Sequence, residues 1–352
     1  MELPHSNLVD PADYETDGLI CDGYQLRVSK YTDLADLGSI RAQQDWSKHV
    51  APTKFYKGTL GDTYDFISLC IPECRPERIE IIAYANEMYF LHDDVVEDSD
   101  KGEGDRLNDA LLEGFLPEQN LSAKTAMSNE TTVPGRQIVQ RKLIRAMMAV
   151  DRTLALKTMA IWTSFLETGC GRSNHTVFDN FDEFMQYRVL DVGKLYWVGA
   201  ITFGMGITLS ESELDVCYSL CHPMWLSCGL INDLYSWPKE RDAAAAQRVG
   251  HVNNAVWVLM KEQSVDEAQA LVLLRDKIRQ CFVDYRAVLL QHGGRLDFSS
   301  ELRRLLHALS FSMIGHLVWS RTAPRYIYGC GFSERQLRWM KDGTPRSIGV
   351  MG

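Results

Sequence analysis

The sequence predicts an all-α protein, and three observations support this prediction. Apolar residues recur with helical spacing along most of the 352 residues, whereas the strict alternation of a β-strand is scarce. No internal repeat is present, and no Pro/Ser-rich linker divides the chain. We therefore expect a single domain, residues 1–352, built from roughly ten packed helices with its site between facing helices.

The first part of the chain is expected to contain an irregular arm followed by two helices. The helical patterns cover residues 63–74 and 75–98, and Pro76 falls in the first turn of the second helix, a position where proline is favourable. Residues 99–134 are polar, with one short amphipathic piece, "ALLEGFL". We expect this stretch to be a mobile surface segment.

The remainder of the chain is predicted to form long helices. The sequences "SESE" (210–213) and "SVDE" (264–267) are typical of a capping box, and Pro223 is expected to kink the helix that contains it. The predicted helices cover residues 137–166, 180–206, 211–240, 252–263, 265–291 and 300–320.

Composition excludes several classes of protein. The net charge is −10 and no run of Lys or Arg occurs, so we expect no nucleic-acid partner. The nine cysteines include no pair of CxxC units and lie mostly in apolar stretches, which favours reduced, buried thiols over a zinc site. No signal peptide is recognised, and the longest apolar run, residues 195–207, is too short to span a bilayer. We expect a cytoplasmic protein.

The sequence "DDVVE" (93–97) is the first candidate site. Asp93 and Glu97 are four residues apart and project from one helix face, with Asp94 beside them. Carboxylates are unfavourable at the C-terminal end of a helix, where the helix dipole already places negative charge. Mg²⁺ prefers carboxylate oxygens and leaves positions for water and substrate phosphates. The alternative interpretation is a solvated acidic helix end.

The sequence "INDLYSWPKE" (231–240) is the second candidate site. Asn232, Ser236 and Glu240 are each four residues apart, so their oxygens form one stripe suited to a further Mg²⁺. Lys239 adds a cation for a phosphate oxygen, whereas Pro238 is expected to bend the helix close to Glu240. The alternative interpretation is a polar stripe that faces solvent.

These two motifs occur together with "QYRVLDVG" (186–193) and "PRYIYG" (324–329), and the ordered set resembles the motifs of class I terpene cyclases. The resemblance covers residues 90–326. The stretch "GLICDGYQLRVSKYTDLAD" (18–36) is similar to the cyclase halves of fungal bifunctional terpene synthases, in which a prenyltransferase domain follows. The resemblance implies the class I terpenoid synthase fold, an α-helical bundle with a central apolar cavity. It also suggests a tethered prenyltransferase domain and a homo-oligomer as partners.

The resemblance implies a role for each motif residue. Three Mg²⁺ ions are expected, two bound by Asp93 with Glu97 or Asp94. In the family, an acidic residue links the arginine that senses diphosphate to a backbone carbonyl. Here the resemblance implies that Asp191 is this acid and that the carbonyl belongs to Val192 or Gly193. A break in the helix is expected at that point. The third ion is implied at Asn232, Ser236 and Glu240. The diphosphate is implied to bind Arg188, Lys239, Arg325 and Tyr326.

Carbocation chemistry also requires an apolar pocket that excludes water and aromatic faces that stabilise positive charge. Phe90 lies three residues before Asp93, and three further rings lie close to the motifs in sequence or on the preceding helix. Ordinary core packing is the alternative role for each ring. The candidates are Phe66, Phe90, Trp225 and Trp319.

The activity that the resemblance implies is a Mg²⁺-dependent ionisation of a linear polyprenyl diphosphate. The expected substrates are the twenty-carbon geranylgeranyl or the twenty-five-carbon geranylfarnesyl diphosphate, and the expected product is a diterpene or sesterterpene hydrocarbon. A chain-elongating prenyltransferase on the same fold is an alternative, although such enzymes carry two Asp-rich motifs. A non-enzymatic acidic metal-binding module is a second alternative, but no Ca²⁺-binding loop pattern is present.

Overall fold

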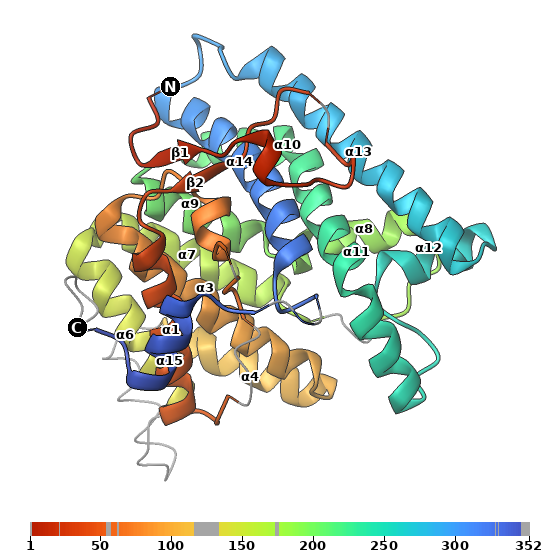
Figure 1. Cartoon of the computed structure of the whole chain (residues 1–352), viewed down its shortest axis with the longest axis horizontal. Helices are drawn as coiled ribbons and strands as arrows, with labels where there is room; N and C mark the ends of the chain where they lie inside the picture. Colours follow the sequence, from red (N-terminus) through yellow and green to blue (C-terminus); the bar gives the residue numbers. More distant parts are fainter. Residues whose placement is uncertain are drawn as a thin grey trace.

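Helices make up most of the computed structural model, which describes residues 2–20, 22–53, 58–61, 63–115, 134–172, 176–327, 329 and 331–345. They pack around one another in a bundle (Figure 1). The β-structure of these described ranges is one short antiparallel pair, β1 (Ser6–Leu8) and β2 (Arg27–Ser29), in which Ser6 lies opposite Ser29. The prediction of an all-α fold is confirmed.

The first helix, α1 (Thr32–His49), was expected to be part of an irregular arm, and that expectation is wrong. It packs closely along α3 (Pro76–Glu97), and Gly38 permits this close approach. A Cβ at position 38 would lie only 2.2 Å from the backbone oxygen of Glu80. Its buried face carries polar side chains, and Gln43 Nε2 donates a hydrogen bond of 2.5 Å to Glu87 Oε1. Such a face has little of the amphipathic contrast by which a helix is recognised.

The helix predicted over residues 63–74 is reduced to α2 (Phe66–Cys70). Asp65 caps its start, because Asp65 Oδ1 accepts a hydrogen bond of 2.9 Å from Ser68 N. The next helix, α3, begins at Pro76 as predicted and ends at Glu97, so the acidic motif occupies its last two turns.

The expectation of a mobile segment over residues 99–134 is wrong for its first half. Residues Lys101–Gly114 form the helix α4, which is capped by a hydrogen bond of 3.0 Å from Glu103 N to Asp100 Oδ1. Leu107 and Leu111 are buried along one side of α4. The remainder of the expected segment, residues 116–133, lies outside the described residues.

Three predicted long helices are each divided in two. Residues 137–166 form most of α6 (Gly135–Val150) and α7 (Arg152–Thr168), separated at Asp151, whose side chain caps α7. Residues 180–206 form α8 (Phe181–Asp191) and α9 (Lys194–Met205). Capping side chains and a left-handed glycine explain these breaks, because both favour a new helix start over continuation.

The third long helix is divided into α10 (Glu211–Leu220) and α11 (His222–Gln247). Pro223 therefore lies in the first turn of α11 and does not kink a longer helix, whereas Pro238 lies inside α11. The capping box predicted at residues 210–213 is present between Ser210 and Glu213.

The second capping box is shifted from its predicted place. Ser264 has a left-handed φ of 53° and ends α12 (Ala255–Gln263). The capping box of α13 (Glu267–His292) is made by Asp266 and Gln269. The chain continues through α14 (Ser300–Thr322), which packs against α2 and α11, and α15 (Glu334–Asp342), which packs against α1.

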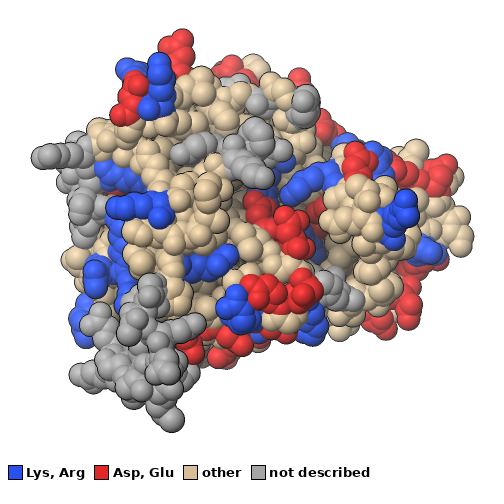
Figure 2. Space-filling view, turned by 90° about the horizontal axis from the view of Figure 1, so that it is seen from below, with Lys and Arg blue, Asp and Glu red and all other residues tan. Residues whose placement is uncertain are grey.

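Surface charge and cysteine state agree with the composition. On the face seen in Figure 2, Lys and Arg side chains are interspersed with Asp and Glu. The seven cysteines within the described ranges are buried and form no disulfide. In the part of the chain that the structure describes, no helix is long and apolar enough to cross a membrane.

Candidate active site

One cavity brings together most of the residues that the sequence predicted as a site. It opens between the C-terminal end of α3, the junction of α8 and α9, the middle of α11 and the segment after α14, and its volume is about 110 Å³. Asp94, Trp225 and Trp319 do not line it. The predicted residues that line it are Phe66, Phe90, Asp93, Glu97, Arg188, Asp191, Val192, Gly193, Asn232, Ser236, Lys239, Glu240, Arg325 and Tyr326.

The face of α3 that borders the cavity presents Asp93 and Glu97, one turn apart. Loss of solvent around its carboxyl, followed by the negative charges of Glu97, Asp191 and Asp94, raises the pKa of Asp93 well above its usual range. Such crowding of carboxylates is unfavourable unless a cation binds among them.

Asp94 is turned toward a different partner. Its two carboxylate oxygens accept hydrogen bonds of 3.0 and 2.6 Å from Nη1 and Nη2 of Arg325. The guanidinium of Arg325 lies 5.0 Å from the centre of the Phe90 ring, a cation–π distance. Asp94 therefore orients a cation that lines the cavity.

Arg188 lines the cavity from α8 and is held by three side chains. Arg188 Nε donates to Asp233 Oδ1 at 2.9 Å, Nη1 donates to Asp191 Oδ2 at 2.7 Å, and Nη2 donates to Asn232 Oδ1. Burial opposes its charge, but Asp233 and Asp191 raise the pKa of Arg188 well above its usual range. Sequence reasoning did not assign Asp233 a role, because it lies off the stripe of Asn232.

The stripe on α11 keeps its predicted geometry despite Pro238. Asn232, Ser236 and Glu240 all line the cavity, and Asn232 Nδ2 donates a hydrogen bond of 2.7 Å to the Tyr326 hydroxyl. Glu240 Oε2 accepts a hydrogen bond of 2.9 Å from Nδ2 of Asn254, a residue that the sequence analysis missed. Asn254 precedes α12, so only the fold brings it to Glu240.

The helix break expected beside Arg188 is present. Helix α8 ends at Asp191, and Gly193 adopts a left-handed φ of 86° before α9 begins. This conformation is strained for any residue with a Cβ. Val192 and Gly193 both line the cavity, so the break exposes backbone there.

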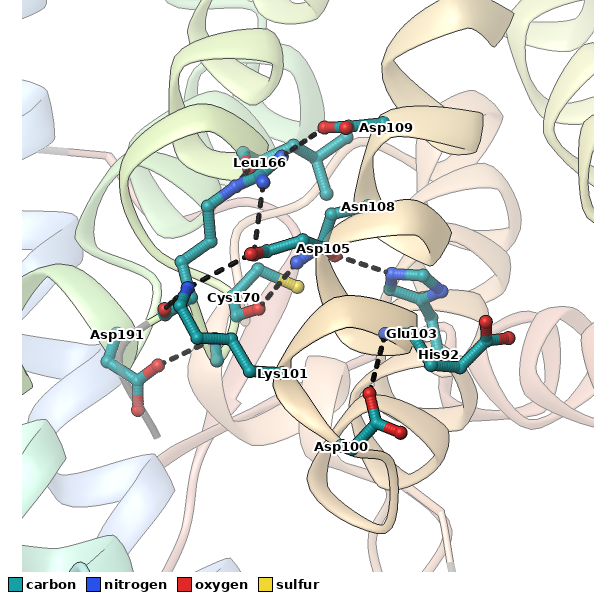
Figure 3. Close-up of polar contacts among 12 residues, drawn as sticks. His92, Asp100, Lys101, Glu103, Asp105, Asn108, Asp109, Leu166, Cys170 and Asp191 are labelled. Carbon is teal, nitrogen blue, oxygen red and sulfur yellow. Dashed lines mark hydrogen bonds and ion pairs between the residues drawn. The ribbon is translucent and has the colours of Figure 1, made fainter. Parts of the chain in front are cut away.

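A chain of hydrogen bonds connects this break to the acidic motif (Figure 3). His92 Nε2 and Asn108 Oδ1 are 2.8 Å apart, and Asn108 Nδ2 donates a hydrogen bond of 2.9 Å to the backbone oxygen of Cys170. The next residue, Gly171, donates its backbone N–H to Asp191 Oδ1 at 2.8 Å. Cys170 adopts a left-handed φ of 53°, a strained conformation that these contacts stabilise.

The aromatic wall of the cavity is centred on Phe66. Its ring centre lies 5.6 Å from Phe90, 5.2 Å from Trp197 and 4.8 Å from Trp319. Trp319 packs behind this wall, where its Nε1 donates a hydrogen bond of 3.0 Å to the backbone oxygen of Thr59. Trp225 is fully buried elsewhere, so its surroundings are those of a core residue.

Seven further residues line the cavity that the sequence analysis did not predict. Asn86 and Tyr89 lie seven and four residues before Asp93, so helical spacing from the motif would have found them. Tyr196 and Trp197 likewise lie four residues after Val192 and Gly193, whereas Phe165, Cys170 and His316 come from elements that carry no motif residue. The missed residues are Asn86, Tyr89, Phe165, Cys170, Tyr196, Trp197 and His316.

Cys170 and His316 also line the cavity, but the side chains predicted to hold a metal, on α3 and α11, offer oxygens, as Mg²⁺ prefers. Within the described residues, no three His, Cys, Asp or Glu side chains are grouped as a ready metal site. The donor chemistry fits Mg²⁺, with carboxylates on α3 and a mixed amide, hydroxyl and carboxylate set on α11.

Comparisons with known proteins assign the chain to a family. Residues 84–284 match the family described as terpene synthase family 2, C-terminal metal binding, and this match covers more than half of the chain. The chain therefore belongs to the terpene synthases of this family, as the motifs indicated.

Three of the curated relatives are fungal enzymes of similar sequence. A bifunctional type I diterpene synthase of Aspergillus flavipes is 41% identical over 347 residues, which are 99% of this chain and 44% of that protein. Fusicoccadiene synthase of Phomopsis amygdali is 40% identical over 98% of this chain and 48% of its own length. A bifunctional sesterterpene synthase of Aspergillus aculeatus is 39% identical over 99% and 48%. The chain spans about half the length of these relatives.

The solved structures show the same fold at low sequence identity. Aristolochene synthase from Penicillium roqueforti is superimposed with a TM-score of 0.64 and 18% identity, over 82% of this chain and 95% of that one. The class I terpenoid synthase fold expected from the sequence is thus confirmed.

Proposed function

We propose that this chain is a class I terpene cyclase that ionises a linear polyprenyl diphosphate and cyclises the resulting carbocation. The observation that carries the proposal is the cavity itself, which is lined by cationic side chains, two sets of oxygen donors and aromatic rings. The names of the relatives, which include diterpene and sesterterpene synthases, support geranylgeranyl or geranylfarnesyl diphosphate as substrate.

Asp93 and Glu97 would hold Mg²⁺ on one side of the diphosphate, and Asn232, Ser236 and Glu240 would hold it on the other; three ions are proposed in total. Bound Mg²⁺ would supply the positive charge that makes diphosphate a good leaving group. The proposal takes its support from the oxygen donors that α3 and α11 both present to one cavity.

Four side chains of the protein complete the diphosphate site. Arg188, Lys239 and Arg325 would pair with its oxygens, and the Tyr326 hydroxyl would donate a hydrogen bond. Asp191 and Asp233 keep the Arg188 guanidinium charged and oriented, so it needs little reorganisation when the leaving group forms. A carbonyl at Val192 or Gly193 would then face the positive charge of the substrate.

The apolar end of the cavity would shape the carbocation. Phe66 and Phe90 present aromatic rings beside the acidic motif, where they stabilise positive charge without reacting with it. The cavity volume of about 110 Å³ is below the roughly 300–1,000 Å³ of pockets for drug-sized ligands, so substrate binding is expected to enlarge it.

The proposal is tested by incubating the purified chain with farnesyl, geranylgeranyl and geranylfarnesyl diphosphate, with Mg²⁺ or with EDTA. We expect Mg²⁺-dependent release of diphosphate and a cyclic hydrocarbon from one substrate, detected by mass spectrometry. Asp93→Asn should abolish both, whereas Asp98→Asn, at an exposed position just outside the cavity, serves as the matched control.

Two results would contradict the proposal. Diphosphate release only when a second prenyl substrate is added would indicate a chain-elongating prenyltransferase. No release under any condition, with Mg²⁺ binding retained, would indicate a metal-binding module. A tethered prenyltransferase domain, a homo-oligomer and a cytoplasmic location remain predictions.

A further inference from the structure

A histidine lies in the aromatic end of the cavity. His316, on α14, lines the cavity with 5% of its surface exposed. Its ring centre is 5.7 Å from Phe66, 6.2 Å from Trp197 and 6.3 Å from Trp319. The imidazole is therefore fixed among the rings that would surround the hydrocarbon part of a substrate.

The hydrogen-bonding capacity of this imidazole is not used up by the protein. Nδ1 of His316 is buried and has no hydrogen-bond partner among the described residues. A neutral imidazole carries one N–H donor and one basic nitrogen, and leaving either unpaired in a buried place costs free energy. An unpaired histidine in an active-site cavity calls for a role in the reaction.

The carboxyl groups along the cavity already have other proposed or observed partners. Asp93 and Glu97 are proposed metal ligands, and Asp191 pairs with Arg188. Burial raises the pKa of Cys170 well above its usual range, which keeps its thiol protonated. Among the described residues that line the cavity, His316 is the only imidazole.

We propose that His316 accepts the proton that ends the cyclisation, an inference that rests on the proposed function. A C–H bond next to the cationic carbon breaks, and its electron pair forms the C=C bond of the product. The proton bonds to a ring nitrogen of His316, which becomes an imidazolium. It passes to water when the product leaves and the cavity refills.

The electrostatic surroundings of His316 suit this cycle. Burial, and then the charge of Arg188, lower the pKa of His316 to about 3. The imidazole is therefore neutral before the reaction and releases its proton readily afterwards. A carbocation is a far stronger acid than an imidazolium of this pKa, so the transfer remains favourable.

The test uses His316→Ala with geranylgeranyl and geranylfarnesyl diphosphate at pH 8, where free imidazole is mostly neutral. We expect diphosphate release within about threefold of the wild-type rate, because ionisation does not use His316. The main product should be replaced by alkenes with the double bond elsewhere or by alcohols. His307→Ala, on the same helix but outside the cavity, should leave the products unchanged.

Chemical rescue separates a basic role from a packing role. Adding imidazole to His316→Ala should restore the wild-type product, whereas pyrrole, which has the same ring size but no basic nitrogen, should not. Equal rescue by both compounds would mean that the ring only fills space, and this would overturn the inference. If His316→Ala does not fold, His316→Gln replaces it and should show the same product change.

Failure of the inference can be told apart from failure of the proposed function. Unchanged products in both His316 variants would overturn the inference alone, because wild-type turnover would still be observed. Absence of Mg²⁺-dependent diphosphate release by the wild-type chain would overturn the proposed function and this inference together.

Discussion

Asp94 and Arg325 form a two-point ion pair, with hydrogen bonds of 2.6 and 3.0 Å between carboxylate and guanidinium. The two residues lie 231 positions apart in the sequence, on α3 and after α14. The pair divides the acidic motif into two kinds of carboxylate. Asp93 and Glu97 line the cavity, whereas Asp94 orients a cation proposed to bind diphosphate.

The first prediction concerns this division. Asp93→Asn should lower kcat/KM by about 10³-fold or more, because it removes a proposed metal ligand. Asp94→Asn should mainly raise KM, by about tenfold, because Arg325 loses its orientation but keeps its charge. Steady-state kinetics of diphosphate release measure both. Equal losses of kcat in the two variants would show that Asp94 also binds metal.

The second prediction concerns the hydrogen bonds in Figure 3. Asn108→Ala removes the contacts to His92 and to the backbone oxygen of Cys170, both of which are buried. We expect a loss of about 1–3 kcal/mol in the free energy of unfolding, because these partners would be left unsatisfied. The KM for substrate should also rise, since Gly171 would hold Asp191 less firmly.

Urea denaturation and kinetics measure these two effects. Asp109→Asn is the matched control, because Asp109 lies on the same helix but its side chain is 65% exposed and contacts Arg172 at the surface. If Asn108→Ala lowers the free energy of unfolding no more than this control does, the hydrogen bonds of Asn108 do not stabilise this part of the fold.

The third prediction concerns the aromatic wall. Phe66→Leu keeps the site apolar but removes the ring that contacts Phe90, Trp197 and Trp319. The product spectrum should change, while diphosphate release stays within about threefold of wild type, because the ring acts after ionisation. Trp225→Phe should leave the products unchanged, since Trp225 does not line the cavity. If Trp225→Phe changed the products and Phe66→Leu did not, the ring that determines the products would be Trp225 and not Phe66.

The fourth prediction is a pH dependence of stability at His316. Its pKa is about 3 in the folded chain and about 6.5 when unfolded. Between these values the unfolded chain binds a proton that the folded chain does not, so protonation favours unfolding. The stability of the wild type, relative to His316→Gln, should fall by about 1.4 kcal/mol per pH unit below pH 6.5.

Denaturant unfolding of both proteins between pH 5 and pH 8 tests this dependence. Parallel stability curves would mean that His316 is protonated equally in both states, contrary to its burial beside aromatic rings. Burial is the larger cause of this lowered pKa, and the positive charge of Arg188 lowers it further.

Helix faces and motif spacing could be predicted from the sequence, because they depend only on residues close together in the chain. Asp93 and Glu97 share a face at a spacing of four, and so do Asn232, Ser236 and Glu240. The family resemblance implied the break at Gly193, where only glycine adopts φ of 86° without strain. Helix α1 could not be predicted, because its buried face carries polar side chains, one of which forms a hydrogen bond with α3.

The sequence by itself determined the helical class, the two sets of oxygen donors and the order of the motifs, since these depend on the periodicity of one helix at a time. Only the tertiary structure decided which partner each side chain has. It paired Asp94 with Arg325, placed Asp233 on Arg188 and set His316 among the rings of Phe66 and Trp197. Such contacts join residues far apart in the chain, and packing of whole helices, which no local pattern encodes, sets their distances.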